Sequence, residues 1–264
     1  MKFVHPHFNN EIDLEDLIVT SAFRKLQDLY QKIPATKCLF CPKKKTVEAD
    51  CCETFHPPFF LTEFLNAFRE TKKWPKEKQY DLYITCIKTF LNPEIHKPCA
   101  LLDKPLCSVY MGRPFSCRMY GQYSQKEWAG RLENVKKALG LEKEEIPMYE
   151  QCPNVEATGT PKTISKEMSD YVFDSIQKLD RKLFQDEKVA KELEKTAATY
   201  LTFDAHYILL HAGPELLETL TDIRLGLKDN RDKFKAKEID EKELEKAENS
   251  IKEFIKIIEN SIRK

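Results

Sequence analysis

Cysteine spacing constrains this chain more than any other feature of its sequence. Seven of its nine cysteines form a pattern, in the order Cys38-x2-Cys41, Cys51-Cys52, Cys99, Cys107 and Cys117. An odd total fits poorly with complete disulfide pairing. Thiolates bind soft metals, so thiols gathered at this density indicate zinc or an iron–sulfur cluster.

The lack of targeting and membrane-spanning segments favours a reducing compartment. The N-terminus lacks the apolar core of a signal peptide, and no apolar run is long enough to span a membrane. We therefore expect a cytoplasmic protein, in which disulfides are disfavoured. The 43 basic and 43 acidic residues give a formal net charge of zero. This balance supplies no field that attracts nucleic acid or an anionic membrane, and we expect neither as a partner.

Apolar periodicity predicts a mainly α-helical fold. Helices are expected to enclose an irregular, loop-rich cysteine core that binds metal, with a C-terminal helical extension. Glycine is scarce, at 7 residues, and Lys/Glu runs are frequent, which favours helices over tight turns. The expected helices span 12–33 with Asp13 as N-cap, a segment from Thr62, 78–91, 128–139, 165–185, 187–211, 214–226 and a last helix after 238.

The same patterns predict two regions. Residues 1–158 form a cysteine-cluster metal-binding module with an N-terminal helix, and residues 164–264 form a helical C-terminal region. The stretch 153–163, rich in proline, glycine and threonine, is the expected linker.

The last helix carries an apolar stripe at steps of three and four residues, made by Leu244, Ala247, Ile251, Phe254 and Ile258. This stripe predicts packing against the chain's own helices. A homodimer or another partner held through this helix is the alternative.

The first four cysteines suit a metal site. Cys38-x2-Cys41 lets one turn wrap an ion and supplies two ligands of a four-coordinate site. Neighbouring side chains diverge, so only one of Cys51 and Cys52 is expected to serve this metal, and the other faces a second metal or takes part in redox chemistry. The spacings are those of neither a ferredoxin nor a zinc ribbon. Cys86 lies mid-helix, where we expect a buried thiol that binds no metal.

The later cysteines lie in a more specific block. The run Cys107-Ser-Val-Tyr-x2-Arg113-Pro114-x2-Cys117-Arg118, preceded by Cys99-Ala-Leu-Leu, resembles the YkgJ-type cysteine-cluster family, which is described as a zinc- or iron-chelating domain. The likeness is nearly position for position over 107–118. The first half departs from the family pattern, because nine residues separate Cys41 from Cys51. The resemblance covers about residues 35–155.

The resemblance implies a metal site and adds a late cysteine to its ligands. The eight expected ligands are Cys38, Cys41, Cys51, Cys52, Cys99, Cys107, Cys117 and Cys152. An iron–sulfur cluster of the 4Fe-4S type is preferred and zinc is the alternative, because so many thiols with flanking arginines suit a cluster. The predicted function is a metal-binding protein with a redox, sensing or structural role. The alternative is a cluster-containing enzyme that modifies a protein or a small molecule, since a flagellin lysine methylase carries a related cysteine cluster.

The arginines of this block have a physical role of their own. Thiolates around a cluster leave a net negative charge, which guanidinium donors offset. We therefore expect Arg113 and Arg118 beside the cofactor, and Tyr120 is the third expected cofactor-binding residue. The alternatives are bidentate binding of an anionic substrate and a surface salt bridge. In the enzymatic alternative, Tyr120 lines a cleft together with both arginines.

Two other groups of residues receive a structural interpretation. His206 and His211 are five residues apart on an expected helix, whereas helical ligand pairs favour three or four. We expect one core histidine and one at a helix end. Lys72 and Lys73, next to Trp74, are expected to form a solvated face, and contact with phosphate groups is the alternative.

Overall fold

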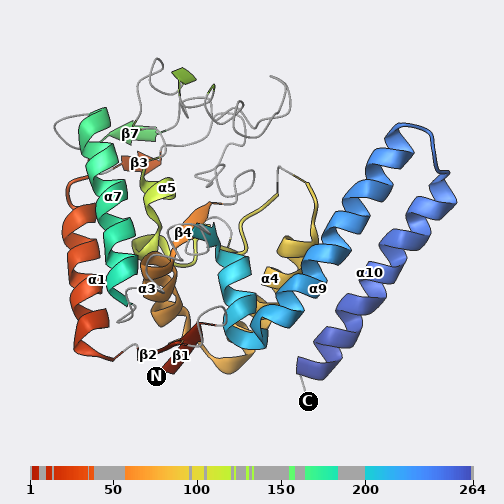
Figure 1. Ribbon diagram of the computed structural model, residues 1–264, viewed down its shortest axis with the longest axis horizontal. Coiled ribbons are helices and arrows are strands. Elements are labelled where there is room, and N and C mark those ends of the chain that lie inside the picture. Colours follow the sequence, from red (N-terminus) through yellow and green to blue (C-terminus); the bar gives the residue numbers. More distant parts are fainter. Residues whose placement is uncertain are drawn as a thin grey trace.

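The computed structural model is mainly α-helical, as the sequence predicts (Figure 1). It describes residues 2–5, 10–13, 15–34, 36–38, 57–94, 97–103, 106–119, 122, 129–130, 133, 155–157, 164–183 and 200–262. The α-helices of these residues are α1 (Leu17–Tyr30), α3 (Leu61–Thr71), α4 (Lys76–Leu91), α5 (Phe115–Arg118), α7 (Lys166–Leu183), α9 (Phe203–Lys235) and α10 (Glu241–Ile262). A short 3-10 turn, η1, spans Tyr110–Gly112.

Short antiparallel ladders tie distant parts of the chain together. The pairs are β1 (Lys2–His5) with β2 (Asn10–Asp13), β3 (Thr36–Cys38) with β7 (Val155–Ala157), β4 (Pro58–Phe60) with β8 (Tyr200–Thr202), and β5 (Leu102–Asp103) with β6 (Leu106–Cys107). The apolar pattern of the sequence does not predict these strands, because none of them exceeds four residues.

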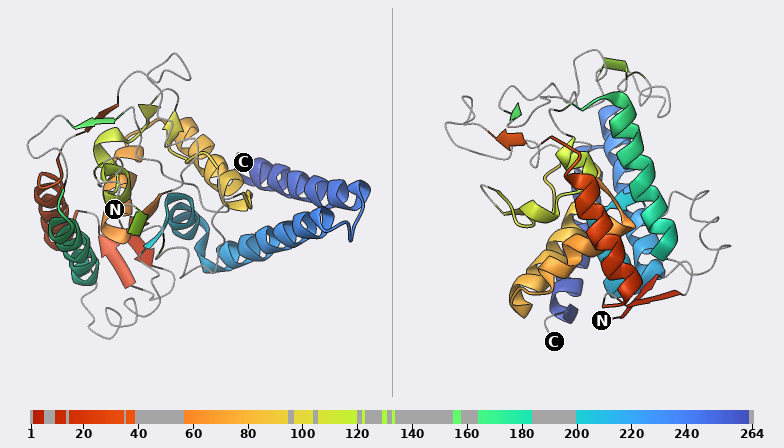
Figure 2. Two further views of the ribbon diagram at one scale, coloured as in Figure 1. Left: turned by 90° about the horizontal axis from the view of Figure 1, so that it is seen from above. Right: turned by 90° about the vertical axis from the view of Figure 1, so that its left-hand side faces the viewer.

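Among the described residues, three apolar clusters lie between the helices. One joins α1, α3, α4 and the start of α9, with Phe64 and Phe203 fully buried in it. A second joins α1, α5 and α7, and the third joins α4, α9 and α10. Helices α1 and α7 run side by side along one flank, while α9 and α10 form a long hairpin on the other (Figures 1 and 2). Each buried Phe or Leu stabilises the fold by about 2 kcal/mol.

The two predicted regions share these clusters. Phe115 packs in one cluster with Val172 and Ile176 of α7, and Ile87 packs in another with Ile208 of α9. Part of the expected linker, Val155–Ala157, forms β7. The division into two regions stays a prediction, and extensive contacts cross its boundary.

The first helix starts later than its pattern predicts. Asp16, not Asp13, is the N-cap, and its carboxylate accepts a hydrogen bond of 2.6 Å from the Ile18 amide. Residue 13 ends strand β2, which pairs with β1. An aspartate can cap a helix at either position, so the pairing of the preceding strand decides which one does.

The long helix α9 is broken where its sequence predicts. Gly213 has φ of 77° and ψ of 179°, a conformation open essentially to glycine alone, and Pro214 follows it. The segments before and after it are helical, and the second continues to Lys235, well beyond the predicted end at 226.

The apolar stripe of the last helix packs within the chain. Ile251, Phe254 and Ile258 of α10 contact the cluster formed by α4 and α9. This is the intramolecular packing that the stripe predicts.

Substitution at two glycines of α9 tests the break. We expect Gly213→Ala to lower the free energy of unfolding by about 2 kcal/mol, because alanine is strained at this positive φ. In contrast, Gly226→Ala should raise it by about 0.5 kcal/mol, because a Cβ at this helical position meets nothing within 4 Å. Urea unfolding of both variants measures the difference. Equal effects would show that the backbone at Gly213 carries no strain for alanine.

Candidate functional site

The cysteine–arginine block folds as a hairpin followed by two short helical turns. Leu102 of β5 pairs with Cys107 of β6, and the Ser108 amide and hydroxyl both donate to the Leu101 carbonyl at 2.9 Å. Turn η1 follows, and Pro114 then precedes α5, which carries Cys117. The block therefore has a defined backbone from Cys107 to Arg118.

Arg118 holds this block together from within. Its Nε donates to the Arg113 carbonyl at 2.9 Å, and its guanidinium donates to the Met111 carbonyl at 2.6 Å. The guanidinium also lies over the Tyr30 ring, 3.9 Å from its centroid. Burial lowers the pKa of Arg118, and the neighbouring Tyr30 and Glu63 oppose this effect. These contacts make Arg118 a brace of the cysteine-bearing turn.

Arg113 makes local contacts. Its guanidinium stacks 3.8 Å from the centroid of the Tyr110 ring, and its Nε donates to the Tyr110 carbonyl at 3.1 Å. Tyr120, the third predicted cofactor-binding residue, lies outside the described residues. The predicted role of these three residues beside a cofactor stays a prediction.

A buried carboxylate anchors the block to the core. Glu63 of α3 is fully buried and accepts three hydrogen bonds: 2.7 Å from the Tyr30 hydroxyl, 3.0 Å from the Phe60 amide and 2.6 Å from the Phe115 amide. Phe115 is the first residue of α5, two positions before Cys117. Glu63 thus joins α1, α3 and the cysteine block at one point.

A second buried carboxylate caps the same helix. Asp180 of α7 accepts hydrogen bonds from the amides of Leu61 and Thr62, at 2.9 and 2.7 Å, and from the Thr62 hydroxyl. These amides belong to the first turn of α3, whose N-cap position is held by Phe60. A phenyl ring cannot accept these bonds, so a residue of another helix does so.

Burial shifts the ionisation of this network. Desolvation, together with a smaller effect of the nearby Asp180, raises the pKa of Glu63 from 4.5 to about 7 although its three hydrogen-bond donors oppose the shift. Burial and the Glu63 carboxylate also raise the pKa of Tyr30 well above its ordinary value. Glu63 therefore changes from its protonated to its ionised form near pH 7.

Three of the eight predicted ligands have described side chains. Cys99 is buried and Cys107 is partly buried, and both pack against the cluster of α3 and α4. Cys117 is partly exposed and lies close enough to Tyr30 to affect its pKa. Among residues with described positions, no group of three or more His, Cys, Asp or Glu side chains is placed to hold a metal ion.

The remaining predicted ligands cannot be placed in full. Only the backbone of Cys38 is described, in β3, and Cys41, Cys51, Cys52 and Cys152 lie outside the described residues. Cys86, predicted to be a buried thiol, is fully buried within α4, and burial raises its pKa.

Described contacts nevertheless join the ends of the cysteine-bearing segments. The Nε2 of the Gln122 side chain donates to the Pro34 carbonyl at 2.6 Å, and the Ser116 hydroxyl donates to the Pro58 carbonyl at 3.0 Å. These bonds tie both ends of the segment 34–58 to residues that flank Cys117. Cys38 pairs with Val155, three residues after Cys152 in the sequence.

Sequence reasoning missed the two carboxylates that organise this site. Glu63 had a local signal, since it stands three residues after an N-cap position, where a glutamate side chain bonds back to the cap amide. Asp180 has none, because its partners are more than a hundred residues earlier in the chain. The two histidines behave as predicted: His206 is buried against the Phe59 carbonyl, and His211 ends the first part of α9.

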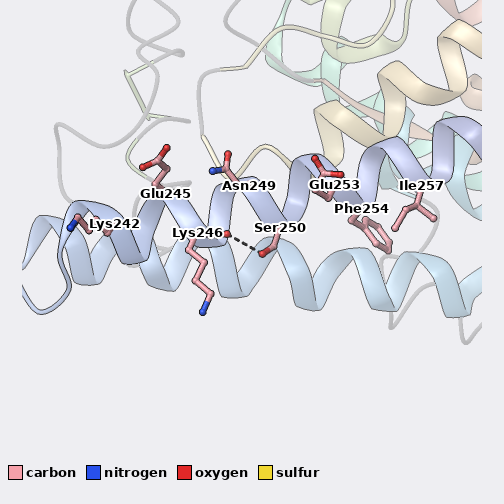
Figure 3. A pocket seen from close by; sticks show the side chains of 8 residues that line it. All are labelled: Lys242, Glu245, Lys246, Asn249, Ser250, Glu253, Phe254 and Ile257. Carbon is pink, nitrogen blue, oxygen red and sulfur yellow. Dashed lines mark hydrogen bonds between the residues drawn. The ribbon is translucent and has the colours of Figure 1, made fainter.

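Hollows at the surface lie elsewhere. One of about 740 Å³ runs along a single helix, α10. All of its lining residues, among them Lys246, Glu253 and Phe254, belong to that helix (Figure 3). Another, of about 550 Å³, lies between α4 and the β5–β6 hairpin, and its lining contains neither Cys99 nor Cys107. Within the described helices, none is both long and apolar enough to cross a membrane.

Comparisons of the chain with family models, curated proteins and solved structures gave no match. The resemblance at 107–118 therefore stays a prediction from the sequence.

Removing the Glu63 carboxylate should destabilise the protein strongly. In Glu63→Ala, three buried donors, on Tyr30, Phe60 and Phe115, lose their acceptor. We expect the free energy of unfolding to fall by about 3 kcal/mol or more. Glu70→Ala, on the same helix but in an exposed pair with Lys73, is the control and should change it by less than about 0.5 kcal/mol. Similar losses in both variants would refute the anchoring role.

Stability should also depend on pH through Glu63. The folded protein holds this proton up to about pH 7, whereas the unfolded chain releases it near 4.5. The contribution is therefore complete below pH 4.5 and is lost as the pH rises through 7, by on the order of 3 kcal/mol. Denaturant unfolding across this range should show the decline in wild type. Glu63→Gln, which cannot titrate, should lack that component, and an unchanged pH profile in this variant would assign the decline to other groups.

Proposed function

We propose that this chain is a cytoplasmic metal-binding protein whose cysteines hold an iron–sulfur cluster of the 4Fe-4S type, with zinc as the alternative occupant. Its role is redox, sensing or structural. The proposed ligands are drawn from Cys38, Cys41, Cys51, Cys52, Cys99, Cys107, Cys117 and Cys152. A bound cluster would supply reversible one-electron transfer, whereas zinc would stabilise the fold alone.

The observation that supports this proposal is that the described ends of two cysteine-bearing segments are bonded to residues near Cys117 or to each other. The segment 34–58 contains four proposed ligands, and its two ends bond to Ser116 and Gln122, on either side of Cys117. The segment that contains Cys152 is likewise fixed at both ends, through Gln122 and through the pairing of Val155 with Cys38. A four-coordinate site needs ligands from distant parts of a chain, and contacts between the ends of these segments support such an arrangement.

The chemistry around Cys117 fits a bound thiolate. A thiolate is favoured by nearby positive charge, and Arg118 follows Cys117 directly on the rigid turn that Glu63 anchors. Because the guanidinium is fixed by two carbonyls, its charge stays close to this turn. The residues of this turn are therefore suited to support Cys117 as a metal ligand without binding the metal themselves.

The enzymatic alternative has less support. It requires a cleft lined by Arg113, Arg118 and Tyr120. Arg118 is engaged with the Met111 and Arg113 carbonyls, and Arg113 stacks on Tyr110. These contacts favour a bracing role for both arginines over the binding of a substrate.

Anaerobic purification followed by metal analysis tests the proposal. We expect a coloured protein with stoichiometric iron and acid-labile sulfide, and Cys117→Ala should lose most of both. Cys86→Ala is the matched control, since Cys86 is buried in α4 and is not a proposed ligand. It should retain the cofactor of wild type.

Three other outcomes are informative. Colourless protein with stoichiometric zinc would identify the alternative occupant. Protein that binds neither metal would refute the proposal. Equal metal loss in Cys117→Ala and Cys86→Ala would show that the loss does not arise from removing a ligand at Cys117.

A further inference from the structure

A half-open pocket lies where the end of α3 and the start of α4 meet the first part of α9. It has a volume of about 360 Å³ and is lined by Lys72, Lys76, Gln79, three tyrosines and His211. A volume of this size suits a small molecule with one ring. The lining shares no residue with the cysteine block, so its function is independent of the metal proposal.

One wall of the pocket is aromatic. The His211 ring lies 4.5 Å from the Tyr207 ring and 5.2 Å from the Tyr83 ring, measured between centroids. Tyr80 completes the wall and is 44% exposed. Rings at such distances and tilts offer faces and edges against which a further planar ring can pack.

The break of α9 fixes the position of His211. The helical conformation is interrupted at Gly213, two residues after His211, so the imidazole lies at a helix end. Although more than a third of the residue is exposed, the buried part of the ring and the nearby Lys72 lower the pKa of His211. The imidazole is therefore uncharged at neutral pH and adds aromatic surface to the pocket.

The lining also carries positive charge. Four lysines occur between positions 72 and 78, and the fold separates them into two kinds. Lys73 pairs with Glu70 and Lys78 pairs with Asp103, each at 3.0 Å. Lys72 and Lys76 line the pocket, and no described carboxylate pairs with either of them. The lining contains no acidic residue, so the pocket concentrates positive charge.

We propose that this pocket binds a small aromatic anion, whose ring packs against Tyr80, Tyr83 and His211 and whose phosphate or carboxylate group is held by Lys72 and Lys76. The aromatic wall selects the ring, and the two ammonium groups select the charge. From the sequence, a solvated lysine face is the default expectation here, because the aromatic side chains come from two distant segments, 80–83 and 207–211.

Titration with simple probes tests this site. Phenyl phosphate and benzoate are each added to the full chain, and the ring resonances of His211 are followed by NMR. We expect saturable shifts with at least one of them, and the tighter probe identifies the anionic group. The double variant Lys72→Met/Lys76→Met should weaken binding about tenfold or more, because it removes both charges and keeps their aliphatic stems.

The matched control is Lys73→Met/Lys78→Met, which removes the same charge from the same segment outside the pocket. It should leave the affinity for the better probe within about twofold of wild type. Thermal melting of both double variants checks that they fold, and Tyr80→Ala, at an exposed position, should weaken binding without altering the fold.

Four results would overturn the proposal. They are the absence of saturable binding of either probe, equal affinity for the better probe and for its anion without the ring (inorganic phosphate or acetate), equal affinity for the better probe and phenol, and equal weakening in the two double variants.

Discussion

The first turn of α3 is the point on which the rest of the fold depends. A helix begins with amides that have no partner within it, and here the N-cap is Phe60, which has no acceptor to offer. Asp180 of α7 accepts from the amides of Leu61 and Thr62, and Glu63 accepts from that of Phe60. Since these groups are buried, leaving them unsatisfied would cost several kcal/mol. The helix is therefore stable only when α7 is in place beside it.

This requirement links the core to the cysteine block. Glu63 has two oxygens, one of which accepts from both Tyr30 and Phe115, so α1 and α5 are fixed to the same carboxylate. Arg118 extends the link, because its guanidinium covers the Tyr30 ring and bonds to two carbonyls of the preceding turns. Burying two carboxylates is costly, and their retention is better explained by the specific arrangement they impose than by net stability. These contacts determine the position of Cys117, which lies two residues after Phe115 on α5.

Long helices were predictable from the sequence, and the contacts between them were not. Periodic apolar residues located α3, α4, α7 and α10 closely, because each buries one face along several turns. The ladder of β4 with β8 joins residues 58–60 to 200–202, and no local pattern marks such a short pair. For the candidate site, the sequence indicated the thiols and arginines but not Glu63 or Asp180. A carboxylate that caps a distant helix looks, in the sequence, like any other acidic residue on a helix face.

The lysine-rich turn between α3 and α4 illustrates the same limit for binding sites. In the sequence, Lys72 and Lys73 are neighbours of the same chemistry, and nothing distinguishes them. In the fold, Lys73 pairs with Glu70, while Lys72 faces His211, whose place depends on the backbone of Gly213. Which lysine of this turn faces the aromatic rings therefore depends on a helix break some 140 residues further along the chain. The charge of a segment can be read from its composition, but which of its charges face a pocket is decided by the elements that pack against it.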